Sequence, residues 1–315
     1  MLGVQRSGVI FCLVSAAAFG GIGIFGKLAY GEGSTVGTLL SVRFVVAAVL
    51  LWGLTAATGA LAGLRRLPRR DVLAALALGG VGYGAQAGAY FLALDRMDAS
   101  LLSLVLYTYP VIVTVAAIAL GRDRASRRTT VALALACSGL VLVLAGAAAG
   151  ALDPLGTGLA LGAAVVYSTY ILVSTGVSER VGPLALSTLV CTGAACSLTL
   201  GSLVSGDLHP GAVSATGFGW LGGLAVVSTV AAIGLFFAGL RLVGPTAASI
   251  LSTLEPVVAV ALAFAVFGES LGPAQLAGGA LVLLAVLVVR TPQRRPHPSR
   301  LEPTPAAAKV IRAQA

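Results

Sequence analysis

The sequence predicts an all-α integral membrane protein with ten transmembrane helices, arranged as two inverted five-helix repeats. Three observations lead to this fold class. The 315-residue chain is 58% hydrophobic and 10% charged, with a mean hydropathy of +1.00, whereas soluble domains carry about 25% charged residues. The apolar residues gather into runs long enough to cross a bilayer. Several residues also recur at one fixed spacing along the chain.

Ten stretches are apolar over about 20 residues, the length that a helix needs to cross a bilayer. They are Gly8–Leu28, Val36–Ala57, Val72–Leu94, Ala99–Leu120, Thr129–Ala149, Pro154–Ser174, Pro183–Val204, Gly217–Leu240, Pro245–Phe267 and Pro273–Arg290. The loops between them are too short for an extramembrane domain. We therefore expect one repeat in residues 1–150 and the other in residues 151–290. The proline-rich tail, residues 291–315, is expected to be disordered and cytoplasmic.

The charged residues of the loops predict the orientation. Arginine clusters follow the second, fourth and tenth stretches, whereas the loops on the other side carry mostly acidic residues. Because cytoplasmic loops are enriched in Lys and Arg, we expect both termini in the cytoplasm and the protein in a bacterial inner membrane. This distribution explains the net charge of +9 without a nucleic-acid partner.

The first apolar stretch has an alternative interpretation as a cleavable signal peptide, because an arginine precedes it and small residues follow. The apolar run continues to about Leu28, beyond any plausible cleavage point. The repeat also needs this stretch as the counterpart of the sixth. We therefore expect it to remain as the first transmembrane helix.

The repeat becomes visible when Pro110 is aligned with Pro256, which also brings Ser103 onto Ser249. Because each repeat has an odd number of crossings, the two halves enter the membrane from opposite sides. Inverted repeats recur in secondary transporters, which bind their solute near the midplane where the repeats meet. The alternative is a gene duplication that was retained for packing alone.

The residues around Pro256 also resemble a known family. The motif consists of the runs 254–259 (LEPVVA), 267–271 (FGESL) and 275–280 (QLAGGA). Together with the pair Arg43-Phe44, it resembles the closing signature of the EamA family in the drug/metabolite transporter superfamily. The first half departs from the pattern, with Tyr109 before its proline. The resemblance extends from Gly8 to about Val289. It implies a ten-helix carrier of small organic solutes such as amino acids, other metabolites or toxic compounds, often an exporter.

Three ionisable residues within the predicted spans are candidates for solute contact or gating. Glu255 lies about 15 Å deep in the ninth span, where a charge usually faces a cavity or a partner. It can take up a proton, meet a cationic group of the solute, or join helices through Ser249 and Ser252. Arg43 either attracts an anionic solute or gates a path, or it extends to the interface. Lys27 is expected to anchor the outer interface.

Tyrosines and hydroxyl groups follow one face of several predicted helices. Polar faces of membrane helices point to a bundle interior or a wet cavity, although they can also serve packing alone. Such groups suit a neutral, zwitterionic or partly apolar solute. We therefore predict a solute cavity lined by Tyr83, Gln86, Tyr90, Ser103, Tyr107, Tyr167, Tyr170, Ser252 and Glu255.

These features favour a secondary transporter that exports small solutes by alternating access, with proton coupling through Glu255 as a further hypothesis. The chain has no Walker A motif, which an ATP-driven transporter would need. A membrane enzyme would need paired carboxylates, a nucleophile site or a metal cluster. The four cysteines and two histidines are not spaced as metal ligands. We therefore expect neither enzyme activity nor a cofactor or metal. A channel is the other alternative, and the oligomeric state is left open, a monomer included.

Overall fold

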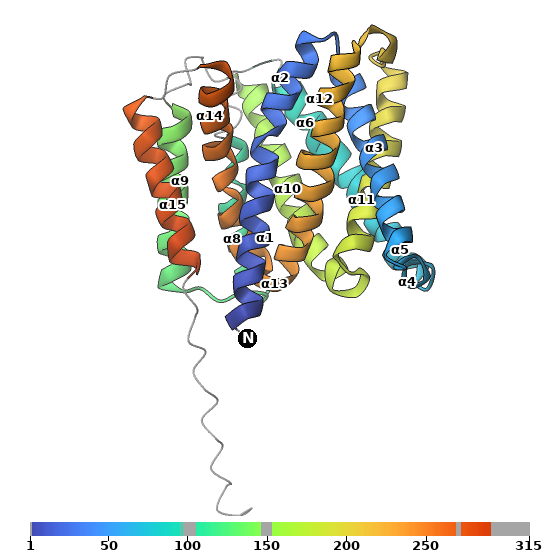
Figure 1. Ribbon diagram of the computed structural model, residues 1–315. Helices are drawn as coiled ribbons and strands as arrows, with labels where there is room; N and C mark the ends of the chain where they lie inside the picture. The colour runs from blue at the N-terminus through green and yellow to red at the C-terminus, as the bar shows by residue number, and fades with distance from the viewer. Residues whose placement is uncertain (1, 95, 97–104, 146–152, 269–271, 291–315) are drawn as a thin grey trace, which may run out of the picture.

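The computed structural model describes residues 2–94, 96, 105–145, 153–268 and 272–290. Throughout these ranges the regular structure is helical, and the long helices run side by side across the molecule (Figure 1). The α-helices are α1 (Leu2–Gly20), α2 (Ile22–Gly31), α3 (Val36–Ala57), α4 (Leu61–Arg65), α5 (Arg69–Ala77), α6 (Gly84–Leu94), α8 (Tyr109–Ala119), α9 (Arg127–Ala145), α10 (Pro154–Val181), α11 (Pro183–Val204), α12 (Ala215–Ala225), α13 (Ala232–Ser252), α14 (Leu254–Phe267) and α15 (Pro273–Arg290). The predicted all-α fold is confirmed.

Apolar helices of membrane-spanning length dominate the described part of the chain. Six stretches there are long and apolar enough to cross a bilayer: Gln5–Gly31, Val36–Ala57, Arg69–Tyr90, Pro154–Val181, Pro183–Val204 and Ala215–Ser252. The shorter apolar helices are Tyr109–Ala119, Leu254–Phe267 and Leu276–Val288. The chain is therefore a multi-pass membrane protein. Ten crossings stay a prediction, because the fourth and fifth predicted spans extend into residues outside the description.

The two halves of the chain run in opposite directions. α1 begins at the lower end of the bundle in Figure 1, and α15 returns to that end. The arginine-bearing helices α4 and α5 lie at the same end. α10, the first helix of the second half, ends there, because its Arg180 pairs with Asp71 of α5. α1 and α10 therefore cross the bundle in opposite senses, as an inverted repeat requires.

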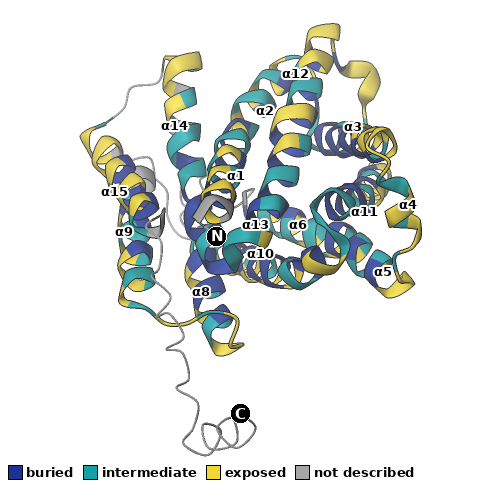
Figure 2. Cartoon of the chain, turned by 60° about the horizontal axis from the view of Figure 1, so that its bottom comes forward, coloured by how far each residue is buried: buried dark blue, intermediate teal, exposed yellow. Residues whose placement is uncertain are grey.

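Burial is concentrated on the helix faces that look into the bundle (Figure 2). Phe44 of α3 and Phe237 of α13 have no exposed surface. α9 and α15 pack closely on each other and stand at one edge of the bundle (Figure 2). Outward-facing apolar residues such as Val49 and Val81 are more than half exposed, as expected for a surface that faces lipid.

Several predicted spans are interrupted, and this corrects the continuous helices that the sequence suggested. The third and eighth spans each contain a π-helical turn, η1 (Leu78–Tyr83) and η3 (Val226–Ala231). Turns at residues 107–108 and at residue 253 stand before α8 and α14. These two helices carry a proline at their start, which removes an N–H donor and clashes with the preceding turn. Equivalent spans of the two halves thus carry the same kind of interruption.

The first span breaks as well, at Gly21 between α1 and α2. The boundary between the eighth and ninth spans lies inside α13, at Gly244. Gly244 has φ 80° and ψ 171°, a left-handed conformation that favours glycine. Pro245 follows it and starts the next helical segment. The predicted start of the ninth span at Pro245 therefore coincides with this backbone turn.

A close crossing of α11 and the third span depends on two glycines. A Cβ atom on Gly79 would lie 1.9 Å from the carbonyl oxygen of Val190. A Cβ atom on Gly193 would lie 2.2 Å from the carbonyl oxygen of Leu76. The two backbones therefore meet directly, an arrangement that small residues permit in membrane proteins.

We expect Gly193→Ala to destabilise the protein by about 1–3 kcal/mol, because the added methyl group forces the two backbones apart. The measurement is the melting temperature of the purified protein in detergent. Gly201→Ala is the matched control on the same helix, since a Cβ atom there meets nothing within 4 Å. Equal melting temperatures for the two variants would contradict the prediction.

Candidate functional site

A continuous chain of aromatic rings runs through the middle of the bundle. The rings of Tyr109 and Tyr167 meet edge to face, with centroids 4.8 Å apart. Tyr107 lies 5.8 Å from Tyr109, Tyr170 stacks 6.0 Å from Tyr167, and Phe237 lies 6.2 Å from Tyr170. Both halves of the chain contribute rings. The structure thus brings together three tyrosines of the predicted set.

Glu255 lies beside these rings, in the first turn of α14. Its carboxyl group lies within electrostatic range of the hydroxyl groups of Tyr107, Tyr109 and Tyr167. The backbone there packs tightly on α1, since a Cβ atom on Gly20 would lie 2.9 Å from the carbonyl oxygen of Glu255. Glu255 therefore contacts elements of the first half.

The predicted link from Glu255 to neighbouring serines takes another form. Ser249 donates to the carbonyl of Thr246 and Ser252 to that of Ala248, each over 2.9 Å. Both hydroxyls therefore bond to their own helix. Ser252 is 5% exposed and lies near Tyr109, which places it beside the aromatic chain.

Arg43 is buried in α3, with 3% of its surface exposed. Its Nε donates to Thr229 Oγ1 over 2.7 Å, and its Nη2 donates to the carbonyl of Ser228 over 3.1 Å. Both acceptors belong to η3 in the second half. The guanidinium also lies over the ring of Phe44, 5.0 Å from its centroid, and that ring meets Tyr83 edge to face. Of the two sequence interpretations, the contacts fit the inward-facing one, because the side chain does not extend to an interface.

Arg43 and Glu255 are not joined as an ion pair. Within the described residues, no carboxylate oxygen lies within 4.0 Å of the Arg43 nitrogens, although the two charged groups are within electrostatic range of each other. Arg43 is held by a hydroxyl group and a backbone carbonyl of η3 instead. We refer to Arg43, Thr229, Tyr107, Glu255 and the aromatic chain as the central cluster.

The other predicted residues lie at the border of this cluster or apart from it. Gln86 and Tyr90 are partly buried in α6, and Tyr90 packs beside Ala160 of α10. Ser103 lies outside the described residues. Lys27 is exposed near the end of α2, with its Nζ 4.3 Å from the ring centroid of Phe267, so it is separate from the central cluster.

Sequence reasoning missed Tyr109, Phe237 and Thr229 of the central cluster, and Ser228 beside it. Tyr109 was noted only as a departure from a family motif, although it is 2% exposed and touches two other tyrosines. Ser228 and Thr229 lie in an apolar run, and two adjacent hydroxyl groups were the only sign of them. Their contact with Arg43 joins positions far apart in the sequence, which local patterns do not reveal.

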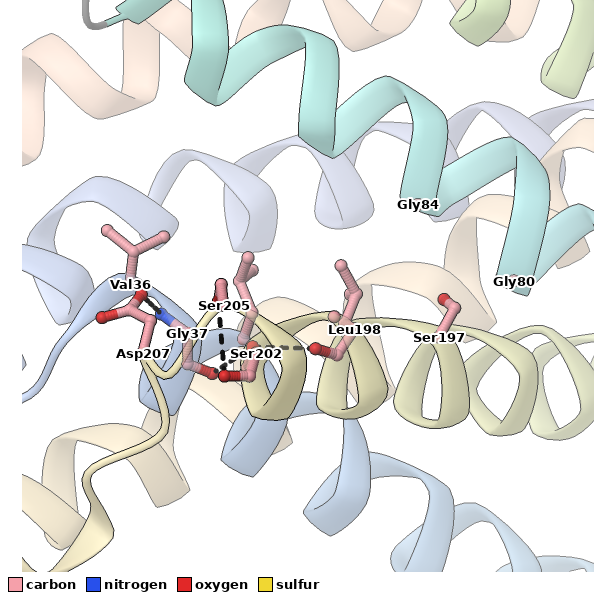
Figure 3. Close-up of a pocket in the computed structure, with 11 residues that line it drawn as sticks. Val36, Gly37, Gly80, Gly84, Ser197, Leu198, Ser202, Ser205 and Asp207 are labelled. Atoms are coloured by element: carbon pink, nitrogen blue, oxygen red, sulfur yellow. Dashed lines mark hydrogen bonds between the residues drawn. The ribbon is translucent and has the colours of Figure 1, made fainter.

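A separate pocket of about 360 Å³ lies between α3, α11 and the η1–α6 region (Figure 3). Its lining is Val36, Gly37, Leu40, Gly80, Gly84, Ser197, Leu198, Gly201, Ser202, Ser205 and Asp207. None of these belongs to the predicted cavity set. At one end, Asp207 Oδ2 accepts a hydrogen bond from the backbone N–H of Gly37 over 2.7 Å (Figure 3).

Polar contacts join the two halves at both ends of the bundle. At one end, Thr35 donates to the carbonyl of Asp207 over 2.6 Å, and the N–H of His209 donates to Thr38 over 2.8 Å. At the other end, Arg180 Nε pairs with Asp71 Oδ1 over 2.8 Å. We call these contacts the Asp207 seam and the Asp71 seam.

Comparison with known proteins decides the family. The EamA-like transporter family matches residues 6–145 and, a second time, residues 154–291. The chain belongs to the EamA-like transporter family. It is therefore a membrane transporter, and the family implies a small-molecule solute and a location in a lipid bilayer.

Individual relatives of this EamA-family chain carry transporter names. The uncharacterized transporter YwfM of Bacillus subtilis (strain 168) is 33% identical over 168 residues, which cover 52% of this chain and 55% of that protein. The match thus spans little more than half of the Bacillus protein. An uncharacterized transporter of Archaeoglobus fulgidus is 30% identical over 203 residues, covering 63% of this chain and 70% of that protein.

A solved crystal structure is similar to this EamA-family chain over most of its length. The TM-score is 0.77, with 17% sequence identity, over 90% of this chain and 96% of that chain. At this identity the likeness shows the fold alone. The two family matches and this likeness agree on an all-α architecture of two repeats.

We expect Tyr109→Ala to destabilise this EamA-family protein by about 3–5 kcal/mol, because it removes a buried ring between two others. Tyr109→Phe keeps the ring and should cost about 1 kcal/mol. The melting temperature in detergent measures both effects. Tyr30→Ala is the control, since Tyr30 is 43% exposed, and an equal loss in that variant would refute the assignment of Tyr109 to the core.

Proposed function

We propose that the protein is a secondary transporter that exports small organic solutes across a bacterial inner membrane, with both termini in the cytoplasm. The observation that carries the proposal is that the charged group of each half lies against residues of the other half. Arg43 of the first half is held by Thr229 of the second. Glu255 of the second half lies beside Tyr107 of the first. Solute transporters built from inverted repeats bind at such a repeat interface.

Alternating access supplies the mechanism. Two repeats that rock against each other expose a site between them to one side and then to the other. The Asp207 seam and the Asp71 seam join the halves at opposite ends. In this proposal each seam closes one side, and each opens in turn. The basic α4 and α5 lie at the Asp71 end, which supports assigning that end to the cytoplasm.

The central cluster is proposed as the solute site. It combines a buried cation, a partly buried carboxyl group and aromatic walls, so it can bind polar and apolar parts of one small molecule. Protons are the proposed coupling ion, since a carboxyl group at the repeat interface can release a proton in one state and regain it in another. Glu255 is the group that would carry it.

A metabolite screen tests the transporter proposal and identifies the solute. Deletion and overexpression strains are compared for efflux and resistance, and the solute found is then loaded into proteoliposomes that contain the purified protein. Saturable counterflow is the expected result. Large single-molecule currents would instead indicate a channel, and the absence of any flux would overturn the proposal.

Glu255→Gln should uncouple transport from protons. One pH unit is worth about 1.4 kcal/mol per proton, so it should sustain about tenfold solute accumulation by the wild-type protein. The variant should retain counterflow and lose this accumulation, because an amide cannot release a proton. The measurement is solute uptake into proteoliposomes with and without an imposed pH gradient. An unchanged gradient response in the variant would refute coupling through Glu255.

Cross-linking the Asp71 seam should stop transport. Asp71→Cys and Arg180→Cys are combined in a variant that lacks the four native cysteines, and a short bis-maleimide then joins them. Counterflow should fall at least about tenfold, because a step that needs this seam to open is blocked. The two single-cysteine variants, treated with the same reagent, are the controls. Full counterflow after complete cross-linking would contradict alternating access through this seam.

A further inference from the structure

The π-helical turn η3 provides a fixed seat for the side chain of Arg43. A π-helical turn is wider than an α-helical one and disturbs the regular backbone bonding. The hydroxyl of Thr229 donates to the carbonyl of Leu224, five positions earlier, over 3.0 Å. Its donor is therefore used, and its oxygen is left to accept from Arg43 Nε. The Ser228 carbonyl accepts from Nη2.

η3 is itself tied to the first half by a second contact. The hydroxyl of Ser228 donates to the carbonyl of Ala18 over 2.6 Å, next to the break between α1 and α2. Ser228 thus bonds to α1 through its side chain and to Arg43 through its backbone. η3 is therefore bonded both to α1 and to Arg43, and these bonds fix the plane of the guanidinium.

Most of the hydrogen-bonding capacity of Arg43 is still unused. A guanidinium has five N–H donors, and two of them reach η3. Among the residues that the structure describes, the other three have no acceptor, although the side chain is 97% buried. Glu255 lies within electrostatic range of Arg43 but forms no ion pair with it, and a buried charge without a directly paired counter-charge is unfavourable in a membrane protein. An anion that places two oxygen atoms beside the free N–H groups of Arg43 would accept their hydrogen bonds and balance the positive charge.

We propose that Arg43, positioned by Ser228 and Thr229, is the binding site for a carboxylate group of the transported solute. A guanidinium fork matches the two oxygens of a carboxylate. Arg43 is the only lysine or arginine buried in the described chain, so one positive charge faces the anion. A singly charged carboxylate balances that charge, whereas a dianionic phosphate would leave a second charge buried.

This inference rests on the proposed function, because it assigns a chemical group to the solute. Ser228 and Thr229 act through Arg43 and are positioning residues. Their hydroxyl and carbonyl groups determine the direction of the guanidinium, so their loss should weaken carboxylate binding and leave the charge in place. Glu255 stands more than 4.0 Å from Arg43, so it does not fill this site.

A binding experiment on the full-length protein in detergent tests the inference. Melting is followed by the fluorescence of the two tryptophans, in titrations with acetate, butyrate and benzoate and with their neutral amides at constant ionic strength. We expect a carboxylate to raise the melting temperature of the wild-type protein, and the matching amide to have no effect. Arg43→Gln should abolish the response.

Variants of Thr229 separate positioning from general stability. Thr229→Val should raise the apparent Kd for the carboxylate at least about tenfold, which corresponds to about 1.4 kcal/mol. Thr229→Ser keeps the hydroxyl and should restore the wild-type value. Thr188→Val is the matched control, because Thr188 also has a buried hydroxyl bonded to α3, at Thr55 over 3.0 Å. Its Kd should be unchanged.

Three results would overturn the inference: no carboxylate stabilises the wild-type protein, amides act as well as carboxylates, or Thr229→Val and Thr188→Val have the same Kd. The outcome is independent of transport, because binding is measured without flux. Carboxylate binding without counterflow would refute the transporter proposal alone. Counterflow without carboxylate binding would refute this inference alone.

Discussion

The fold depends on one constraint, which is that backbone polar groups inside a bilayer need partners within the protein. Interrupted helices expose such groups, and here hydroxyl groups from neighbouring helices reach the carbonyls beside the interruptions. These bonds run from Ser228 to Ala18 (2.6 Å), from Ser15 to Ala232 (2.7 Å) and from Ser168 to Tyr109 (3.4 Å). Because each bond joins two helices, the interruptions connect the bundle as well as bending it.

The same constraint explains where the charged groups lie. Arg43 is tolerated in the middle of the bundle because η3 offers a carbonyl and a hydroxyl oxygen at the right place. Glu255, at the start of α14, lies beside Tyr107 of the other half. Continuous α-helices would have used these backbone groups internally. The interruptions therefore make the charges possible, and the charges make the repeat interface chemically distinctive.

The sequence predicted the all-α membrane fold because long apolar runs are a local signal, and the Pro110–Pro256 spacing indicated the two repeats. It also placed Glu255 and most of the tyrosines near each other, since each lies well inside a predicted span. It did not reveal the seat of Arg43. A threonine within an apolar run has the same local pattern whether it faces lipid or an arginine. The contact between Arg43 and Thr229 joins residues 186 positions apart, so only the packed structure brings it to light.

The two repeats share their backbone interruptions and differ in what those interruptions hold. η3 seats a cation, whereas η1 packs on α11 through Gly79 and Gly193. The two repeats therefore have the same backbone interruptions. The charged groups, in contrast, occupy different positions in the two repeats and meet where the repeats contact each other. Each charged group stands on one half and lies against groups of the other. Any movement of the halves against each other must then change the surroundings of both charges together, which is the coupling that a carrier with one central site requires.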